Sequence, residues 1–174
     1  MILPLIYYGN PLLRKKTAKI EIIDAAIHSL VKDMDETLAT HEGGVGLAAP
    51  QIGQSIALFI TRIPIFENDE LIDPGKLKVY INPHILSYSK ELWPCQEECL
   101  SILDISEVVE RPAEIKIQAT DLNGHLFEET LTEFDAHVFL HENDHLNGVL
   151  FIDRLPKKKK AQIAKILHKT IRNK

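Results

Sequence analysis

The sequence predicts an α+β protein in which short, mostly antiparallel strands surround a central helix that carries the motif His-Glu-x-x-His. Several short apolar segments are separated by close turns, which is typical of antiparallel hairpins and not of alternating strand and helix units. Three longer segments carry apolar residues at helical spacing: one near the N-terminus, the central one, and a basic one at the C-terminus. The 174 residues, 45% of them hydrophobic, suit a single domain over residues 1–174 with its own core.

The N-terminal helix follows an extended segment over residues 1–20 that turns at Gly9-Asn10-Pro11. We expect the helix to begin near Asp24 and to end by Thr40, before the glycine pair Gly43-Gly44. Apolar residues at positions i, i+3, i+4, i+7 and i+11 predict an amphipathic helix packed on a core. This stripe consists of Ile27, Leu30, Val31, Met34 and Leu38.

The middle of the chain supplies the predicted strands, because its apolar residues come in short runs between turn-forming residues. A surface loop is expected at residues 64–75, which are rich in Asn, Asp, Pro and Gly, and a break at Asn82-Pro83. A hairpin turn is expected at residues 121–124. The predicted strands are residues 56–61, 77–81, 84–88, 115–120 and 126–131.

Two helices are expected after the strands. The central one begins with a predicted capping box, in which Thr132 is the N-cap and Asp135 lies three residues later, and it ends at Gly148. The last helix is expected at residues 157–171 and is amphipathic. Its stripe consists of Ile163, Ile166, Leu167 and Thr170.

The central helix carries His141, Glu142 and His145 in the pattern His-Glu-x-x-His. Residues four apart lie on one face of a helix, so the two imidazoles can bind one metal ion. Glu142 can then take a proton from a water on that ion. The alternative is that two histidines fall at this spacing by chance on a solvated face, so the question is whether the chain supplies a third ligand.

That third ligand has to come from upstream or from Asp153. Phe151 stands where one downstream pattern has a third histidine, and no acidic residue follows Asp153. His137 precedes His141 by one turn, about 5.4 Å, while metal–nitrogen bonds are about 2.0–2.1 Å, so core packing or pocket lining is predicted for it. Cys99 is the stronger candidate, because a thiolate and two imidazoles leave a fourth position open for water. The alternative for Cys99 is an ordinary buried cysteine.

Residues 44–51 are almost all small and have the sequence Gly-Val-Gly-Leu-Ala-Ala-Pro-Gln. Glycine and alanine let another chain approach closely, so the backbone at Val45 and Gly46 is expected to stay open for pairing with an extended peptide. The alternative is a flexible turn. Gln51, a lone amide among apolar neighbours, argues against that alternative and is predicted to be a positioned hydrogen-bond donor.

Composition and charge limit the class of protein. Two cysteines are too few for a disulfide framework, and no apolar run approaches the roughly 18–20 residues of a membrane span, so we expect a soluble, cytoplasmic protein. Nine of the 20 Lys and Arg residues lie between Arg154 and Lys174, where there is no Asp or Glu, although the net charge is −5. Such a basic tail indicates either an anionic partner or a solvated terminal helix.

Three separated segments resemble motifs of one family, the peptide deformylases. Residues 44–51 resemble its Gly-x-Gly-x-Ala-Ala-x-Gln motif, in which the first two variable positions are apolar. Residues 97–101, Glu-Glu-Cys-Leu-Ser, are similar to its Glu-Gly-Cys-Leu-Ser, and residues 141–145 match its His-Glu-x-Asp-His. Residues 10–14 and Arg111-Pro112 extend the resemblance over essentially the whole chain.

The resemblance implies a metal-dependent hydrolase that removes the formyl group from the N-terminal formyl-methionine of newly synthesised proteins and releases formate. It supports a metal site made of Cys99, His141 and His145, a donor set that suits zinc, iron, nickel or cobalt. Within the family, Fe²⁺ is the expected ion. The implied partners are formyl-methionyl nascent peptides and ribosomal RNA, the latter through the basic helix over residues 157–174; no membrane or DNA partner is expected.

The same resemblance assigns roles to further residues. Glu142 is the expected general base and acid, and the Gln51 amide and the Leu100 backbone N–H are the expected donors to the carbonyl oxygen of the substrate. The positions expected to bind substrate are Val45, Gly46, Glu97, Phe134 and His137.

Two residues depart from the family pattern. Glu98 stands where the family has glycine, which places a negative charge beside the expected thiolate, and His137 stands where the family usually has an apolar residue of the substrate pocket. Two other functions stay open: a zinc endopeptidase with the same motif, and a catalytically impaired homologue that only binds peptide because Glu98 has disabled the site.

Overall fold

The computed structural model describes residues 1–172, with side chains described up to Lys169. This part of the chain contains three α-helices and nine strands in antiparallel sheets, which confirms the predicted α+β class. Residues 173–174 of the expected basic tail lie outside it. Three short 3-10 helices, η1 to η3, are Pro11–Arg14, Ala49–Ile52 and Phe151–Arg154.

Helix α1, Ala25–Ala39, begins and ends where the sequence predicts. The Asp24 side chain accepts hydrogen bonds from the backbone N–H groups of Ala26 and Ile27, and it thereby caps the first turn. The most deeply buried residues of the predicted stripe are Val31, Met34 and Leu38.

The main sheet is antiparallel and has the strand order β1-β2-β5-β8-β9. Within β2, Phe59 packs into the same core as the inner face of α2, whereas Leu58 and Ile60 pack with α1 on the opposite side. β1 pairs only with β2 and therefore forms an edge of the sheet. The bounds are Gly46–Ala48 for β1, Leu58–Thr61 for β2, Lys78–Tyr88 for β5, Glu114–Thr120 for β8 and Leu126–Thr132 for β9.

Two hairpins stand outside this sheet. β6, Leu92–Cys99, and β7, Ile102–Pro112, form a long ribbon that the sequence did not predict. β3, Ile65–Glu67, and β4, Glu70–Asp73, form a short exposed hairpin, so the prediction of a loop over residues 64–75 is wrong. The hairpin turns at Asn68-Asp69, where both residues have positive φ (49° and 65°), as its tight turn requires.

The predicted break at Asn82-Pro83 does not end a strand either. β5 continues through it as one strand with a bulge, where the pairing with β8 shifts between Ile81 and His84. Asn82 has a φ of 49°, and its side chain bonds the backbone N–H and C=O of Ile20 at 2.9 and 2.8 Å. The bulge therefore ties the N-terminal segment to the sheet.

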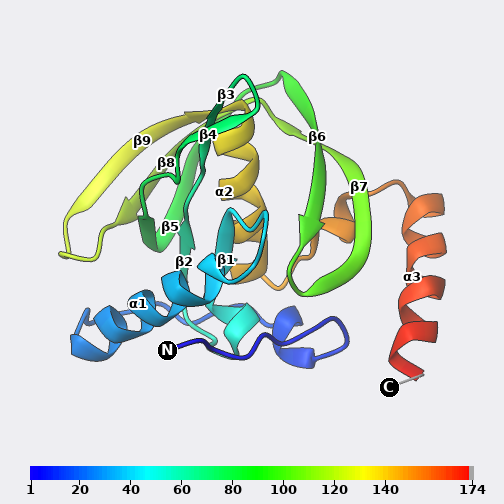
Figure 1. The fold of residues 1–174 in the computed structure, drawn as a ribbon, viewed down its shortest axis with the longest axis horizontal. Helices are drawn as coiled ribbons and strands as arrows, with labels where there is room; N and C mark the ends of the chain where they lie inside the picture. The colour runs from blue at the N-terminus through cyan, green and yellow to red at the C-terminus, as the bar shows by residue number, and fades with distance from the viewer. Residues whose placement is uncertain (173–174) are drawn as a thin grey trace.

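Helix α2, Glu133–Leu146, lies between the main sheet and the β6–β7 ribbon (Figure 1). Thr132 is its N-cap as predicted, but the Thr132 side chain makes no capping hydrogen bond, so the predicted capping box is wrong. The helix ends just before Gly148, whose φ of 69° suits glycine. Both flanks of α2 are covered, which places its histidines inside the protein.

Helix α3, Lys157–Arg172, runs beside the ribbon at the edge of the molecule (Figure 1). Ile163 and Leu167 are buried in a cluster that also contains Cys99. Ile166 of the predicted stripe is 53% exposed, and the side chain of Thr170 lies outside the described part of the chain. Among residues 1–172, no helix is long and apolar enough to cross a membrane.

Candidate metal centre

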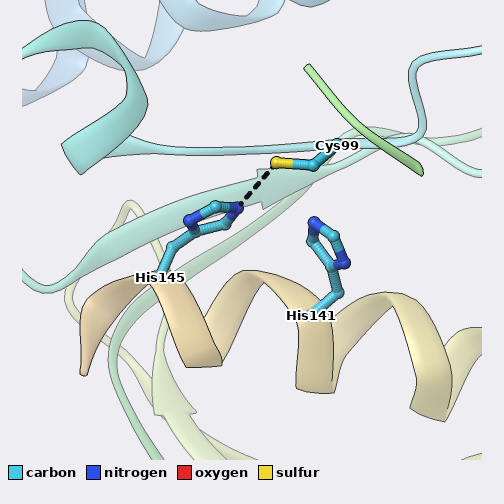
Figure 2. A group of neighbouring side chains, drawn as sticks. All are labelled: Cys99, His141 and His145. Carbon is cyan, nitrogen blue, oxygen red and sulfur yellow. Dashed lines mark hydrogen bonds between the residues drawn. The ribbon is translucent and has the colours of Figure 1, made fainter. Parts of the chain in front are cut away.

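Cys99, His141 and His145 bring their donor atoms together. Cys99 is the last residue of β6, and the two histidines project toward it from successive turns of α2 (Figure 2). The donor atoms of the three side chains all lie within 4.8 Å of one another, and Cys99 Sγ is 3.4 Å from His145 Nε2. Asp153, the other candidate for the third ligand, instead binds Arg14 and Lys160.

Glu97 fixes the orientation of His141. Its carboxylate accepts a hydrogen bond from His141 Nδ1 at 2.7 Å and from Arg111 Nε and Nη2 at 2.5 and 3.1 Å. Burial alone would raise the pKa of Glu97, but the hydrogen bonds from His137, His141 and Arg111 outweigh it and hold this pKa well below its usual range. An ionised carboxylate only accepts, so His141 carries its hydrogen on Nδ1 and leaves Nε2 free as a ligand.

Arg111 connects this carboxylate to a second one on α2. Its Nη1 donates to Asp144 Oδ2 at 2.9 Å, and Arg154 donates to the same carboxylate from Nη2 at 2.6 Å and from Nε at 3.1 Å. The chain of contacts joins β6, β7, α2 and η3. Sequence reasoning assigned no role to Arg111 or Asp144, although both lie in the motif segments that carry the resemblance.

The donor set fits a divalent transition metal ion. Burial lowers the pKa of His141, but its contacts with Cys99 and Glu97 outweigh this and raise it well above the ordinary value. For His145, burial together with the positive charge of His141 lowers the pKa well below the ordinary value. The two imidazoles are therefore not both protonated, and two imidazoles with a sulfur donor suit zinc or iron.

Glu142 lies beside these donors without a partner of its own. The side chain is buried, and its Oε2 makes no hydrogen bond to any described residue. Burial is the largest cause that raises the pKa of Glu142 to about 7, against the lowering effect of His141. A carboxyl group with a pKa near neutrality suits proton transfer in both directions.

Gln51 is buried and held by its surroundings. Its Oε1 accepts from the Ala48 backbone N–H at 2.8 Å, which turns Nε2 toward Ser101 Oγ at 3.3 Å and Cys99 Sγ at 3.7 Å. The amide donor therefore points at Cys99 of the metal centre. Leu100, the second expected donor, directly follows Cys99 in the wall of the same pocket.

Two of the metal donors, Cys99 and His141, line a pocket of about 850 Å³. Its walls come from residues 42–46, from the end of the β6–β7 ribbon over residues 96–106, and from the face of α2 that carries His141. Glu98 also lines it and is exposed, so this departure from the family glycine places a carboxylate at the pocket rim. All five residues expected to bind substrate line the pocket: Val45, Gly46, Glu97, Phe134 and His137.

The strand pairing corrects one detail of the expected peptide contact. The Val45 carbonyl already accepts a hydrogen bond from Arg62 N–H at 2.9 Å, so it is not open for pairing. Because Val45 and Arg62 form a hydrogen-bonded pair, the next pair, Gly46 and Thr61, is not hydrogen-bonded, and the N–H and C=O of Gly46 point away from β2. Gly46 therefore offers both backbone groups at the free edge of β1.

The comparisons agree with this site. The polypeptide deformylase family model matches residues 2–161. A peptide deformylase of Pseudothermotoga lettingae is 40% identical over 164 residues, which cover 94% of this chain and 89% of that protein. The crystal structure of the peptide deformylase from Ehrlichia chaffeensis has a TM-score of 0.89 at 30% identity and covers 99% of this chain and 98% of its own.

A further similar structure carries a bound peptide. This Met-Ala-Ser complex of the class I type b peptide deformylase from Acinetobacter baumannii has a TM-score of 0.81 at 31% identity, and it covers 89% of this chain and 99% of that one. In sequence, in fold and in the residues of its metal site, this chain belongs to the polypeptide deformylase family.

Proposed function

We propose that this protein is a peptide deformylase that hydrolyses the formyl group from the N-terminal formyl-methionine of newly made proteins and releases formate. The observation that carries this proposal is the placement of Glu142. An unpartnered, buried carboxyl group lies on the same helix as two metal donors, in a pocket that the free edge of β1 borders. Family membership supplies the substrate class.

The side chains divide the reaction between them. Cys99, His141 and His145 would hold a divalent ion, which would make water more acidic and place a positive charge beside the substrate carbonyl. Glu142 accepts the proton of the attacking water and later gives it to the departing amine. The Gln51 amide and the Leu100 backbone N–H donate to the formyl oxygen as charge develops there, and one such donor commonly contributes about 2.7–4 kcal/mol.

The peptide is held by the walls of the pocket. Gly46 pairs with the backbone of the extended substrate at the free edge of β1. Phe134, His137 and Glu97 border the space for the first side chain. The Acinetobacter baumannii relative binds Met-Ala-Ser, and we expect peptides of this kind to bind here in the same pocket.

We further propose Fe²⁺ as the working ion, with Zn²⁺, Ni²⁺ or Co²⁺ as possible substitutes. One sulfur and two imidazole donors accept all four ions. The decisive assay measures formate release from formyl-Met-Ala-Ser, together with metal analysis of protein purified without oxygen. We expect one equivalent of iron and rapid formate release. Cleavage of internal peptide bonds would point to an endopeptidase, and peptide binding without formate release would point to an impaired homologue.

The basic helix α3 suits docking to ribosomal RNA, which would place the enzyme in the cytoplasm beside emerging chains. Lys159 and Lys160 form ion pairs with Glu107 and Asp153, so they are committed to the fold. Four other lysines of α3 are exposed and make no ion pair to a described residue: Lys157, Lys158, Lys165 and Lys169.

This docking is best tested by substitution, because removal of α3 would uncover the core around Ile163 and Leu167. Changing the four exposed α3 lysines to Gln is expected to weaken ribosome binding by at least about tenfold and to reduce its salt dependence. The matched control changes four exposed lysines of the body, namely Lys15, Lys16, Lys76 and Lys90. Equal binding by both variants, or binding insensitive to salt, would refute the proposal.

A further inference from the structure

Ser101 is a buried polar residue behind the wall of the pocket. It lies in the turn that joins β6 to β7, two residues after Cys99, and only 1% of it is exposed. Ser101 does not line the pocket, although Leu100 and Ile102 on either side of it do. Any effect of the Ser101 hydroxyl on the reaction therefore passes through another side chain.

That side chain is Gln51, whose amide contacts the Ser101 hydroxyl. Gln51 Oε1 accepts from the Ala48 backbone N–H at 2.8 Å, so the other end of the amide is the NH₂ group. Its nitrogen, Nε2, carries two hydrogens and accepts none. Nε2 donates to Ser101 Oγ at 3.3 Å and lies 3.7 Å from Cys99 Sγ. Ser101 thus takes one hydrogen and leaves the other on the side of the metal centre.

Two contacts together fix the plane of the Gln51 amide. The last torsion of a glutamine side chain has a broad energy minimum, so one hydrogen bond at one end leaves the amide free to tilt. The Ala48 N–H holds the oxygen end, and Ser101 Oγ holds the nitrogen end. Without the Ser101 hydroxyl, the nitrogen end, which is the donor, loses its anchor.

The backbones of Gln51 and Ser101 are joined independently by the N-terminal segment. The Ile6 N–H donates to the Gln51 carbonyl at 2.8 Å, and the Tyr8 N–H donates to the Ser101 carbonyl at 2.8 Å. These backbone hydrogen bonds hold both residues in place without the help of the Ser101 side chain. Removal of the hydroxyl is therefore expected to free the amide without moving the turn that carries Cys99.

We propose that Ser101 is a positioning residue for the Gln51 amide: it accepts one N–H and thereby aims the other at the formyl oxygen of the substrate. The inference rests on the proposed function, in which Gln51 is one of two donors to this oxygen. Leu100, the other donor, directly precedes Ser101, so the same contact fixes the two donors relative to each other. Because these donors act most strongly in the transition state, a tilted amide lowers kcat more than it changes KM.

The test combines kinetics on formyl-Met-Ala-Ser with metal analysis. Ser101→Ala is expected to lower kcat by at least about tenfold, because small displacements of catalytic groups are costly, while KM and metal content stay within about twofold. Ser101→Thr keeps the hydroxyl and is expected to stay within about threefold in kcat. In protein that already carries Gln51→Ala, adding Ser101→Ala should change kcat by less than about twofold, because no amide is left to position.

A second readout does not depend on turnover. The two side-chain N–H signals of Gln51 are followed by NMR in the zinc-loaded protein and are identified by their loss in Gln51→Ala. We expect both signals to shift in Ser101→Ala, because the hydrogen bond to Oγ is lost. Ser89→Ala is the matched control: its hydroxyl also accepts one N–H, from Glu114 at 3.0 Å, and it lies outside the pocket.

Three results would overturn the proposal: an unchanged kcat in Ser101→Ala, an equally large loss with and without Gln51→Ala, or a lowered metal content in Ser101→Ala. The last would show that Ser101 supports Cys99 instead. Ser101→Gly gives a second variant without the hydroxyl if Ser101→Ala does not fold. If the unsubstituted protein releases no formate, the proposed function fails, whereas the Gln51 signals still show whether Ser101 holds the amide.

Discussion

At the scale of single residues, the position of Glu142 depends on the absence of a side chain at Gly46. A Cβ atom at Gly46 would lie 2.5 Å from Glu142 Oε1 and 2.8 Å from its Cγ and Cδ. The same glycine exposes its backbone groups at the free edge of β1. One residue therefore serves both the proton-transfer group and the peptide-binding edge, and no other residue type meets both demands.

The first prediction concerns this contact. Gly46→Ala is expected to push the Glu142 carboxylate aside and to lower kcat/KM for formyl-Met-Ala-Ser by at least about tenfold, because small displacements of catalytic groups are costly. Metal content should stay unchanged, because Gly46 is not one of the three clustered donors and the atoms nearest to an added Cβ all belong to Glu142. Activity close to that of the unsubstituted protein would show that Glu142 does not need this space.

Glu142 itself gives the second prediction. Glu142→Ala should retain the metal ion, because the three donors remain, and should lose turnover by about 10²–10⁴-fold, the usual contribution of a general base. Formate release and metal analysis on the same preparation test both halves of the prediction. Unchanged turnover would remove Glu142 from the role of base.

The third prediction concerns Cys99. Cys99→Ser replaces a soft sulfur donor by a weakly acidic hydroxyl, which is a poor ligand for a transition metal ion. The metal content of the purified variant should therefore fall well below one equivalent. Full metal content with normal activity would eliminate Cys99 as a ligand.

At the scale of elements, the sequence predicted the helices and strands whose apolar residues recur at a regular spacing, and it missed those whose apolar residues do not. The stripe of α1 and the alternation of β8 and β9 follow helical and strand periods, and these elements form as expected. The β6–β7 ribbon was missed because the residue types of β6 do not follow its burial: Glu97 is buried, whereas Leu92 and Pro94 lie at exposed positions. The residue types of β6, the strand that carries Cys99, therefore reflect the metal site and not a hydrophobic pattern.

The metal site was also predictable only in part. The spacing of His141 and His145 on a helix predicted two of the donors, and Cys99 was predicted from the choice of ligand types and from the family resemblance. The network of Glu97, Arg111 and Asp144 joins residues from β6, β7 and α2, and such tertiary proximity leaves no periodic trace in a sequence.

Asp153 links three elements in a pH-dependent way and gives the fourth prediction. Burial alone would raise its pKa, but hydrogen bonds from Arg14, Lys160 and the Leu150 N–H outweigh this and lower it from the usual 3.8. The folded-state pKa lies below the unfolded value. The stabilisation is therefore complete above the unfolded pKa and is lost as the pH falls below about 3.8 through the folded value.

Asp153→Asn should therefore cost about 1 kcal/mol in the free energy of unfolding at pH 7, and this cost should shrink below pH 4. Urea unfolding of both proteins between pH 3 and pH 7 measures the difference. A difference that stays constant down to pH 3 would contradict the assigned ionisation.

At the scale of the whole molecule, the metal centre sits where separate cores meet. Cys99 belongs to the cluster that contains Ile163 and Leu167 of α3, whereas α2 contributes Phe139 to the aromatic core under the main sheet. Cys99 comes from the ribbon, and His141 and His145 come from α2. A bound ion would therefore connect the ribbon and α3 to the core under the main sheet. Metal binding and folding are therefore coupled.

This coupling gives the fifth prediction. Removal of the metal ion with a chelator should lower the Tm, because a ligand present at a thousand times its Kd stabilises the folded state by about 4.1 kcal/mol. Thermal unfolding followed by circular dichroism, with and without added metal ion, measures the shift. Cys99→Ser is the control and should show a smaller shift. An identical Tm for the metal-free and metal-loaded protein would contradict the coupling.

The free edge of β1 has a consequence for the range of substrates. A strand edge recognises the peptide backbone, which is the same in every protein, and is indifferent to the side chains that follow the first residue. Under the proposed function, one pocket serves the constant methionine and one short edge serves the variable remainder. β1 has only three residues, so it can form few backbone hydrogen bonds with a bound peptide. The enzyme can in this way process the beginnings of thousands of unrelated proteins and release each one.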